Sequence, residues 1–143
     1  MGATITAGGV VTIVVGYVPK PEGRAALHAA IEQARLRGES LHVLNSTKGD
    51  SYLDSSFASD SDLAEVRRLL EASGVPFELD QKIGGHGGAD DVIDIAESIK
   101  ATLVVIGLRH RTPTGKLIFG SDAQRILLDV ACPVLAVKAV PGT

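Results

Sequence analysis

The stretch from Leu103 to Gln124 contains the residue types that could bind a charged ligand. Residues 103–106 form a continuous apolar run, which predicts a strand buried on both faces, and Gly107 ends it. Ser121, followed three residues later by Gln124, has the spacing of a capping box and predicts a helix N-cap. Such a strand, loop and helix direct free backbone N–H groups and the positive end of the helix dipole at the loop. This arrangement favours an anion.

The loop between this strand and this helix is cationic. No Asp or Glu occurs from Ser98 through Ser121, whereas the whole chain has a formal net charge of -3. A basic loop on a mildly acidic protein predicts an anionic ligand, with phosphate as the first candidate. The alternative is a solvated loop whose basic residues only keep the protein soluble. The basic residues of the stretch are Lys100, Arg109, Arg111 and Lys116, with His110 between the two arginines.

Alternating strand and helix patterns predict the scaffold around this loop. They indicate an α/β fold, an open five-stranded parallel sheet with helices on both faces. Residues 10–15 and 103–106 are apolar on both strand faces, so they belong in the centre of the sheet. The resulting strand order is 3-2-1-4-5, and ligands bind such sheets at the switch point between the first and fourth strands. The predicted strands are 10–15, 41–44, 75–80, 103–106 and 134–140.

Length, charge and hydropathy limit the classes of function. A chain of 143 residues predicts one domain over 10–140, preceded by a loose N-terminus at 1–9. A pI near 5.7 argues against nucleic-acid binding, and no apolar run is long enough to cross a membrane. Cys132 is the only cysteine, so no intramolecular disulfide forms and we expect it to pack as a small apolar residue. We therefore expect a cytoplasmic protein.

Three other segments lead to specific predictions. Residues 45–60 are polar and without periodicity, which predicts a partly ordered flap, and residues 82–88 predict a glycine-rich turn without phosphate-loop spacing. The strand Val134 to Val140 is apolar on both faces and lies at a sheet edge. An uncovered edge of this kind would aggregate, so we expect a homodimer through this strand.

The glycine spacing near the end of the chain resembles that of the universal stress protein family. The family pattern is Gly-x2-Gly-x9-Gly-Ser/Thr, and the matching positions here are Gly107, His110, Gly120 and Ser121. The similarity covers nearly the whole chain and includes the sequence CPVLAV at 132–137. The resemblance implies a flavodoxin-like sandwich, of the adenine nucleotide alpha hydrolase type, in a dimeric cytoplasmic protein of the stress response. Some members bind ATP or another adenine nucleotide, with or without Mg²⁺, and others bind none.

The resemblance also implies a site. Gly107, Gly120 and Ser121 match phosphate positions of the family. Val43 matches a position against the base, and Gly16 lies with Val18 on the base and ribose side.

Two positions depart from the family pattern. Val18 stands where nucleotide-binding members have aspartate, so an acceptor for ribose or base is lost. His110 replaces glycine and fills space beside the phosphate, and a left-handed backbone there would cost about 1 to 2 kcal/mol. The imidazole can instead donate to a phosphate, more strongly when protonated.

Three functions stay open from the sequence. The first is a dimeric stress protein that binds an adenine nucleotide or another phosphorylated ligand at 107–121. The second is a family member that binds no nucleotide and acts through protein contacts. The third is a slow nucleotide hydrolase that relies on the charges of Arg109, Arg111 and Lys116. We expect no catalytic residues and no metal ligands, because neither a Ser-His-Asp set nor metal-ligand spacing occurs near the loop.

Overall fold

The computed structural model describes residues 12–48, 56–110 and 117–139, in which strands and helices alternate as expected. The strands are β1 (Thr12–Gly16), β2 (Ser40–Lys48), β3 (Phe77–Gly85), β4 (Leu103–His110), β5 (Leu117–Ile118) and β6 (Val134–Lys138). The helices are α1 (Pro21–Arg37), α2 (Asp60–Ser73), α3 (Gly88–Ser98) and α4 (Ser121–Asp129). The predicted loose N-terminus lies outside the described residues. None of the described helices has the length and apolar character needed to span a bilayer.

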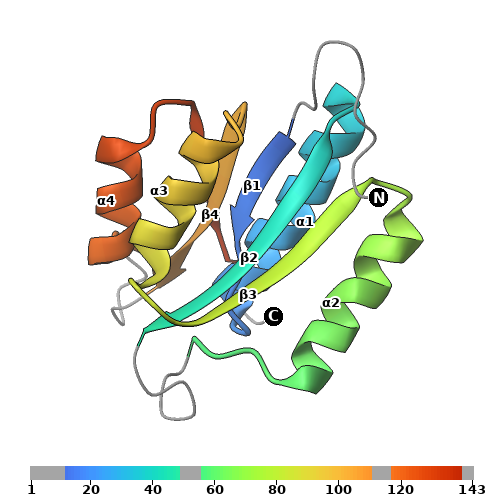
Figure 1. Ribbon diagram of the computed structural model, residues 1–143, viewed down its shortest axis with the longest axis horizontal. Coiled ribbons are helices and arrows are strands. Elements are labelled where there is room, and N and C mark those ends of the chain that lie inside the picture. Colours follow the sequence, from blue (N-terminus) through green and yellow to red (C-terminus); the bar gives the residue numbers. More distant parts are fainter. Residues whose placement is uncertain (1–11, 49–55, 111–116, 140–143) are drawn as a thin grey trace.

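The sheet confirms the predicted order of parallel strands. Its parallel ladder runs β3-β2-β1-β4-β6, so β6 takes the predicted fifth place beside β4. In the centre, Val14 of β1 is paired with His42 on one side and Val104 on the other. Helices α1 and α2 cover one face of the sheet, and α3 and α4 cover the other (Figure 1).

The two central strands supply both halves of the core. Ile13 and Val15 of β1 point toward α1 and α2, while Val14 and Val104 point toward α3 and α4, and all four side chains are fully buried. Burial on both faces explains why these strands are continuous apolar runs.

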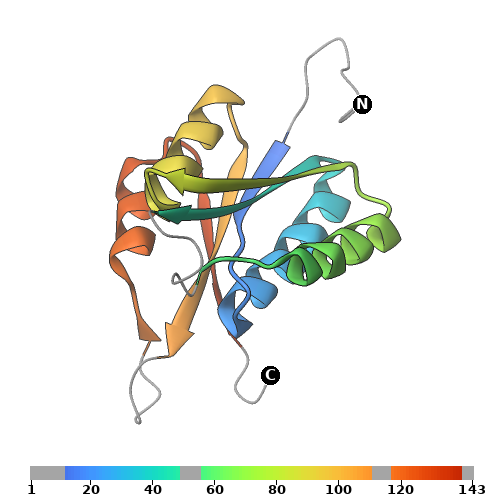
Figure 2. The same ribbon diagram turned by 60° about the horizontal axis from the view of Figure 1, so that its bottom comes forward.

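Strands β2 and β3 are longer than the sequence predicts. Both continue past the carboxyl end of β1 toward the start of α3 (Figure 2), through positions where we expected a flap and a glycine-rich turn. The added part of β2 contains Asn45, Ser46 and Thr47, which are polar yet buried. Tertiary hydrogen bonds of Asn45 override the low preference of asparagine for strands. The remainder of the expected flap, residues 49–55, lies outside the described residues.

Strand β5 was not predicted. It pairs antiparallel with the end of β4, with Arg109 opposite Ile118 and His110 opposite Leu117. His110 therefore has an extended backbone, and Lys100 is the single non-glycine residue with positive φ in the described part of the chain. We expected that a left-handed backbone at His110 would cost free energy. This cost does not arise, because pairing with β5 keeps the backbone of His110 in the strand region of φ and ψ.

Candidate functional site

A cavity of about 230 Å³ lies at the carboxyl ends of β1 and β4. Its walls come from the segment after β1, from the ends of β2 and β4, and from the first turns of α1, α3 and α4. This is the point at which the strand order reverses, and it is where the sequence placed a ligand.

Most of the predicted site residues described by the structure line this cavity. Val43 does not, because its side chain is fully buried in the core under α1 and α2, and Leu44 and Ser46 of the same strand line the cavity instead. His110 is placed by its backbone at the end of β4, while Arg111 and Lys116 lie outside the described residues. The predicted residues that line the cavity are Gly16, Val18, Gly107, Arg109, Gly120 and Ser121.

Three helices begin at this cavity without a side-chain cap. The N-cap residues are Lys20 for α1, Gly87 for α3 and Gly120 for α4, and none of them forms a capping hydrogen bond through its side chain. By contrast, α2 contributes no residue to the cavity and has a complete capping box between Ser59 and Asp62. Backbone N–H groups in the first turns of α1, α3 and α4 are thus available to a ligand.

The predicted N-cap of α4 was wrong by one residue. Gly120 is the N-cap, and Ser121 is the first residue of the helix. The Gln124 side chain donates to the carbonyl of Phe119 at 3.0 Å rather than completing a capping box. Without a capping side chain, the start of this helix stays open toward the cavity.

Two cations line the cavity without an ion-pair partner among the described residues. They are Arg109, near the end of β4, and Lys20, directly before Pro21 at the start of α1. The neighbouring Arg125 is different, because its guanidinium lies 2.5 Å from Asp90 and 3.5 Å from Asp129. The hydrogen bond and charge of Asp90 raise the pKa of Arg125, so this cation is already engaged within the protein.

Lys20 lines the cavity but was not among the predicted site residues. Its place directly before a proline that begins a helix is the sequence signal that could have identified it. Glu22 and Asp122 also line the cavity, so the wall is not uniformly basic. The preference of the cavity for an anion therefore depends on the positions of Arg109 and of the helix N-termini within its wall.

Gly107 permits a close backbone contact at the cavity. A Cβ atom at this position would overlap the carbonyl oxygen of Glu22 in the first turn of α1. A Cβ atom at Gly23 would likewise overlap the carbonyl oxygen of Val18. Both glycines hold the start of α1 against β4 and the end of β1, so packing explains them whether or not a phosphate binds.

A buried asparagine behind the cavity was also missed by the sequence analysis. Asn45 has no exposed surface, and its Nδ2 donates to the carbonyls of Tyr17 and Ser56 at 2.9 and 2.8 Å. Its Oδ1 accepts from the backbone N–H of Ala58 and from Nε2 of Gln81. Asn45 thereby fixes the segment that carries Ser56, which is part of the cavity wall.

Tyr17 lines the cavity, but its side chain also belongs to the core. Its side chain is buried with the cluster under α1 and α2. This burial raises the pKa of the Tyr17 phenol, and the nearby Asp62 carboxylate raises it further. The phenol therefore stays neutral at physiological pH.

Comparisons with known proteins agree with this fold. The chain matches the model of the universal stress protein family over residues 10–138. A universal stress protein of Mycolicibacterium smegmatis is 48% identical over 126 residues, which are 88% of this chain and 96% of that protein. A solved universal stress protein of Archaeoglobus fulgidus is 31% identical with a TM-score of 0.67, covering 90% of this chain and 98% of that one.

A further structure is that of a universal stress protein from Archaeoglobus fulgidus in complex with dAMP. It is 25% identical, with a TM-score of 0.64, and the match covers 94% of this chain and 100% of that one. The family match over 10–138 and the 48% identity to the mycobacterial relative lead to one conclusion. This chain belongs to the universal stress protein family.

Proposed function

We propose that this universal stress protein binds an adenine nucleotide in the cavity between β1 and β4, and that it acts in a cytoplasmic stress response. The observation that carries the binding proposal is the meeting of three uncapped helix starts with Lys20 and Arg109, two cations that have no ion-pair partner among the described residues. A phosphate beside Gly120 would accept from the free N–H groups of α4 and from the guanidinium of Arg109. The dAMP complex of the Archaeoglobus fulgidus relative supports the adenine nucleotide as the ligand class.

A second cavity of about 370 Å³ adjoins the first and offers room for the rest of the nucleotide. The two share Val18, Ser46, Ser56, Gly88 and Asp122 in their walls. Val18 supplies no carboxylate to the ribose or base, so recognition on this side depends on other residues of the shared wall, such as Ser46, Ser56 and Asp122. We therefore place most of the affinity at the phosphate end.

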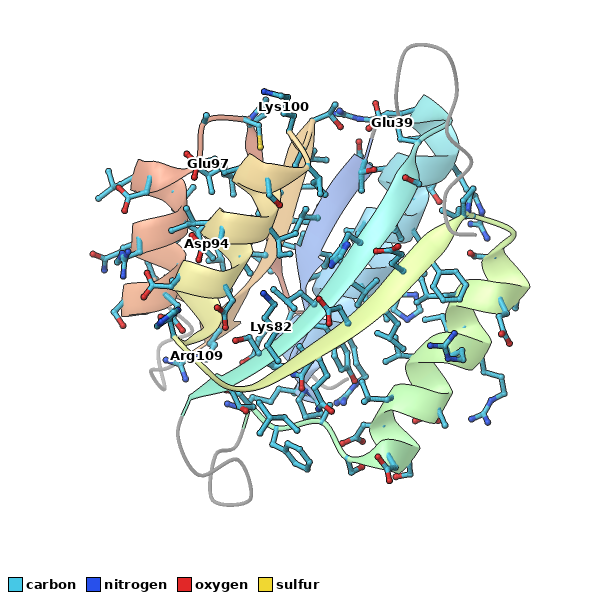
Figure 3. All side chains as sticks on the ribbon, viewed as in Figure 1. Glu39, Lys82, Asp94, Glu97, Lys100 and Arg109 are labelled. Atoms are coloured by element: carbon cyan, nitrogen blue, oxygen red, sulfur yellow. The ribbon has the colours of Figure 1, made fainter. Side chains whose placement is uncertain are left out.

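Replacing Arg109 with glutamine should weaken nucleotide binding by about tenfold or more, because a charge-assisted hydrogen bond to phosphate is lost. The measurement is calorimetric titration of the full chain with ATP, AMP and cyclic AMP, with and without Mg²⁺. Lys100→Gln is the matched control, since Figure 3 places Lys100 at the opposite end of the sheet from Arg109. Equal affinities in the two variants would place the nucleotide elsewhere. No binding of any nucleotide to the unmodified protein would favour the alternative of a family member that acts through protein contacts.

A gain-of-binding variant provides a second arm of this experiment. Val18→Asp restores the carboxylate that the family resemblance implies for nucleotide-binding members, and the side chain at this position lines both cavities. We expect it to raise the affinity for adenosine phosphates about tenfold, because a ribose hydroxyl gains a charged acceptor. Ribose 5-phosphate should respond in the same direction. Inorganic phosphate, which lacks the ribose, should not.

We also propose a homodimer through β6. This strand pairs only with β4 among the described strands, and all four of its apolar residues, Val134–Val137, stay half-buried in the single chain. A second copy would cover this edge. Gel filtration with light scattering should give twice the mass of 14.8 kDa at micromolar concentration. A monomer under these conditions would contradict the proposal.

A further inference from the structure

A second cluster of polar side chains lies where β3 turns into α3. One ligand atom each from the imidazole of His86 and the carboxylates of Asp91 and Asp94 come within 4.8 Å of one another. His86 belongs to the turn, while the two aspartates are three residues apart and so share one face of α3. None of the three lines the cavity proposed for the phosphate, although His86 lies in the wall of the adjoining second cavity. The cluster therefore requires an explanation of its own.

Asp91 is the unusual member, because its carboxylate is buried with no counter-charge. Its exposed fraction is 3%, and among the described residues its hydrogen-bond partner is the hydroxyl of Ser46, which donates to Oδ2. The adjacent Asp90 is more exposed and yet has the guanidinium of Arg125 at 2.5 Å. No Lys or Arg of the described residues forms an ion pair with Asp91 or Asp94. Burying a carboxylate without a counter-charge is costly, so a cation supplied from outside the chain would stabilise this arrangement.

We propose that His86, Asp91 and Asp94 bind a divalent transition-metal ion. One imidazole nitrogen and two carboxylate oxygens suit ions such as Zn²⁺, Co²⁺ and Mn²⁺. Ligand bonds to such an ion are about 2.0 to 2.2 Å long, so ligand atoms within 4.8 Å need only small movements to share it. His86 and Asp94 are exposed, which allows both this movement and the entry of the ion (Figure 3 labels Asp94 on α3).

The surroundings of Asp91 hold it in place as the fixed ligand. The hydroxyl of Ser46, on the extended part of β2, orients its carboxylate in the way that outer partners orient metal ligands. Gly85 leaves room for this carboxylate, because a Cβ atom there would lie 2.5 Å from Oδ2 of Asp91. Two exposed ligands thus converge on one buried ligand, with other coordination positions left to water.

Calorimetric titration of the full chain with Zn²⁺ tests the proposal. We expect one ion per chain, and affinities lowered about tenfold or more in His86→Asn and in Asp94→Asn. The matched controls are His28→Asn, an exposed histidine of α1, and Glu97→Gln, an exposed acid one turn beyond Asp94 on α3 (Figure 3). Both controls should bind Zn²⁺ as the unmodified protein does. Titration with Co²⁺ followed by visible absorption should give the same order of variants.

Thermal unfolding provides a readout that does not depend on the heat of binding. Zn²⁺ should raise the Tm of the unmodified protein and of the two controls but not of Asp94→Asn, because a ligand stabilises only a folded state that binds it. Asp94 is exposed, so its replacement leaves the core intact, and circular dichroism verifies the fold. Absence of saturable binding would overturn the proposal, as would Zn²⁺ binding that His86→Asn and Asp94→Asn leave unchanged.

Discussion

Replacing Gly107 with alanine is expected to lower the free energy of unfolding by about 3 kcal/mol or more. The new methyl group would overlap the carbonyl oxygen of Glu22, and both partners in this contact are backbone. A clash between backbones is relieved only by moving α1 away from β4, whereas a clash with the end of a side chain is relieved by a change of rotamer. Urea unfolding followed by circular dichroism measures the difference.

Gly16→Ala is the matched control for this variant. Gly16 lines the same cavity, but a Cβ atom there would lie 3.5 Å from Cγ2 of Val92, which is an ordinary contact. We expect its free energy of unfolding to stay within about 1 kcal/mol of the unmodified protein. Similar losses in the two variants would mean that the contact with Glu22 does not constrain Gly107. The comparison also matters for ligand studies, because weaker nucleotide binding by an unfolded Gly107→Ala protein would say nothing about phosphate.

Replacing Asn45 with alanine is expected to lower the free energy of unfolding by about 3 kcal/mol. The substitution removes both ends of a fully buried amide and leaves the carbonyls of Tyr17 and Ser56 and the N–H of Ala58 without that partner. A buried polar group without a hydrogen-bond partner destabilises the folded state by its full desolvation free energy. Urea unfolding gives the global effect. Limited proteolysis should show faster cleavage near Ser56, because this segment loses its attachment to β2.

Two variants test whether the asparagine itself is the centre of this network. Gln81→Ala removes one donor to Asn45 from a half-buried side chain of β3, so we expect a loss of only about 1 kcal/mol. Asn45→Asp keeps the shape but removes both amide donors, so it should resemble Asn45→Ala. If Gln81→Ala cost as much as Asn45→Ala, the edge strand rather than the asparagine would be the main support of the segment at 56–58.

The central part of the fold could be predicted because its signals are local. Continuous apolar runs identified β1 and β4. The ends of α1 and α2 carry equally local signals, since each helix ends at a glycine in the left-handed conformation, Gly38 and Gly74. The longer course of β2 could not be predicted in this way. Its polar residues are buried by partners far along the chain, such as Asp91 for Ser46 and Gln81 for Asn45.

The position of the candidate site could be predicted, but its details could not. The ends of β1 and β4 meet wherever the strand order reverses, which correctly brought Gly16, Gly107 and Ser121 to one cavity. The sequence did not determine which face of the sheet each side chain of β2 points to. Neighbouring residues of a strand point to opposite faces, so Val43 lies in one core and Leu44 at the cavity. His86 could not be linked to Asp91 and Asp94 from the sequence, because residues 82–88 were predicted only as a glycine-rich turn.

Because β4 pairs with β5, Gly107 and His110 are under different structural constraints, although both belong to the same motif. At Gly107 every side chain is excluded by the backbone of α1, so substitutions there endanger folding. At His110 the backbone is extended, a conformation that any L-residue adopts, so a substitution there meets no backbone strain. Over evolution, the residue at position 110 can therefore vary without backbone strain, whereas close packing against α1 holds position 107 to glycine.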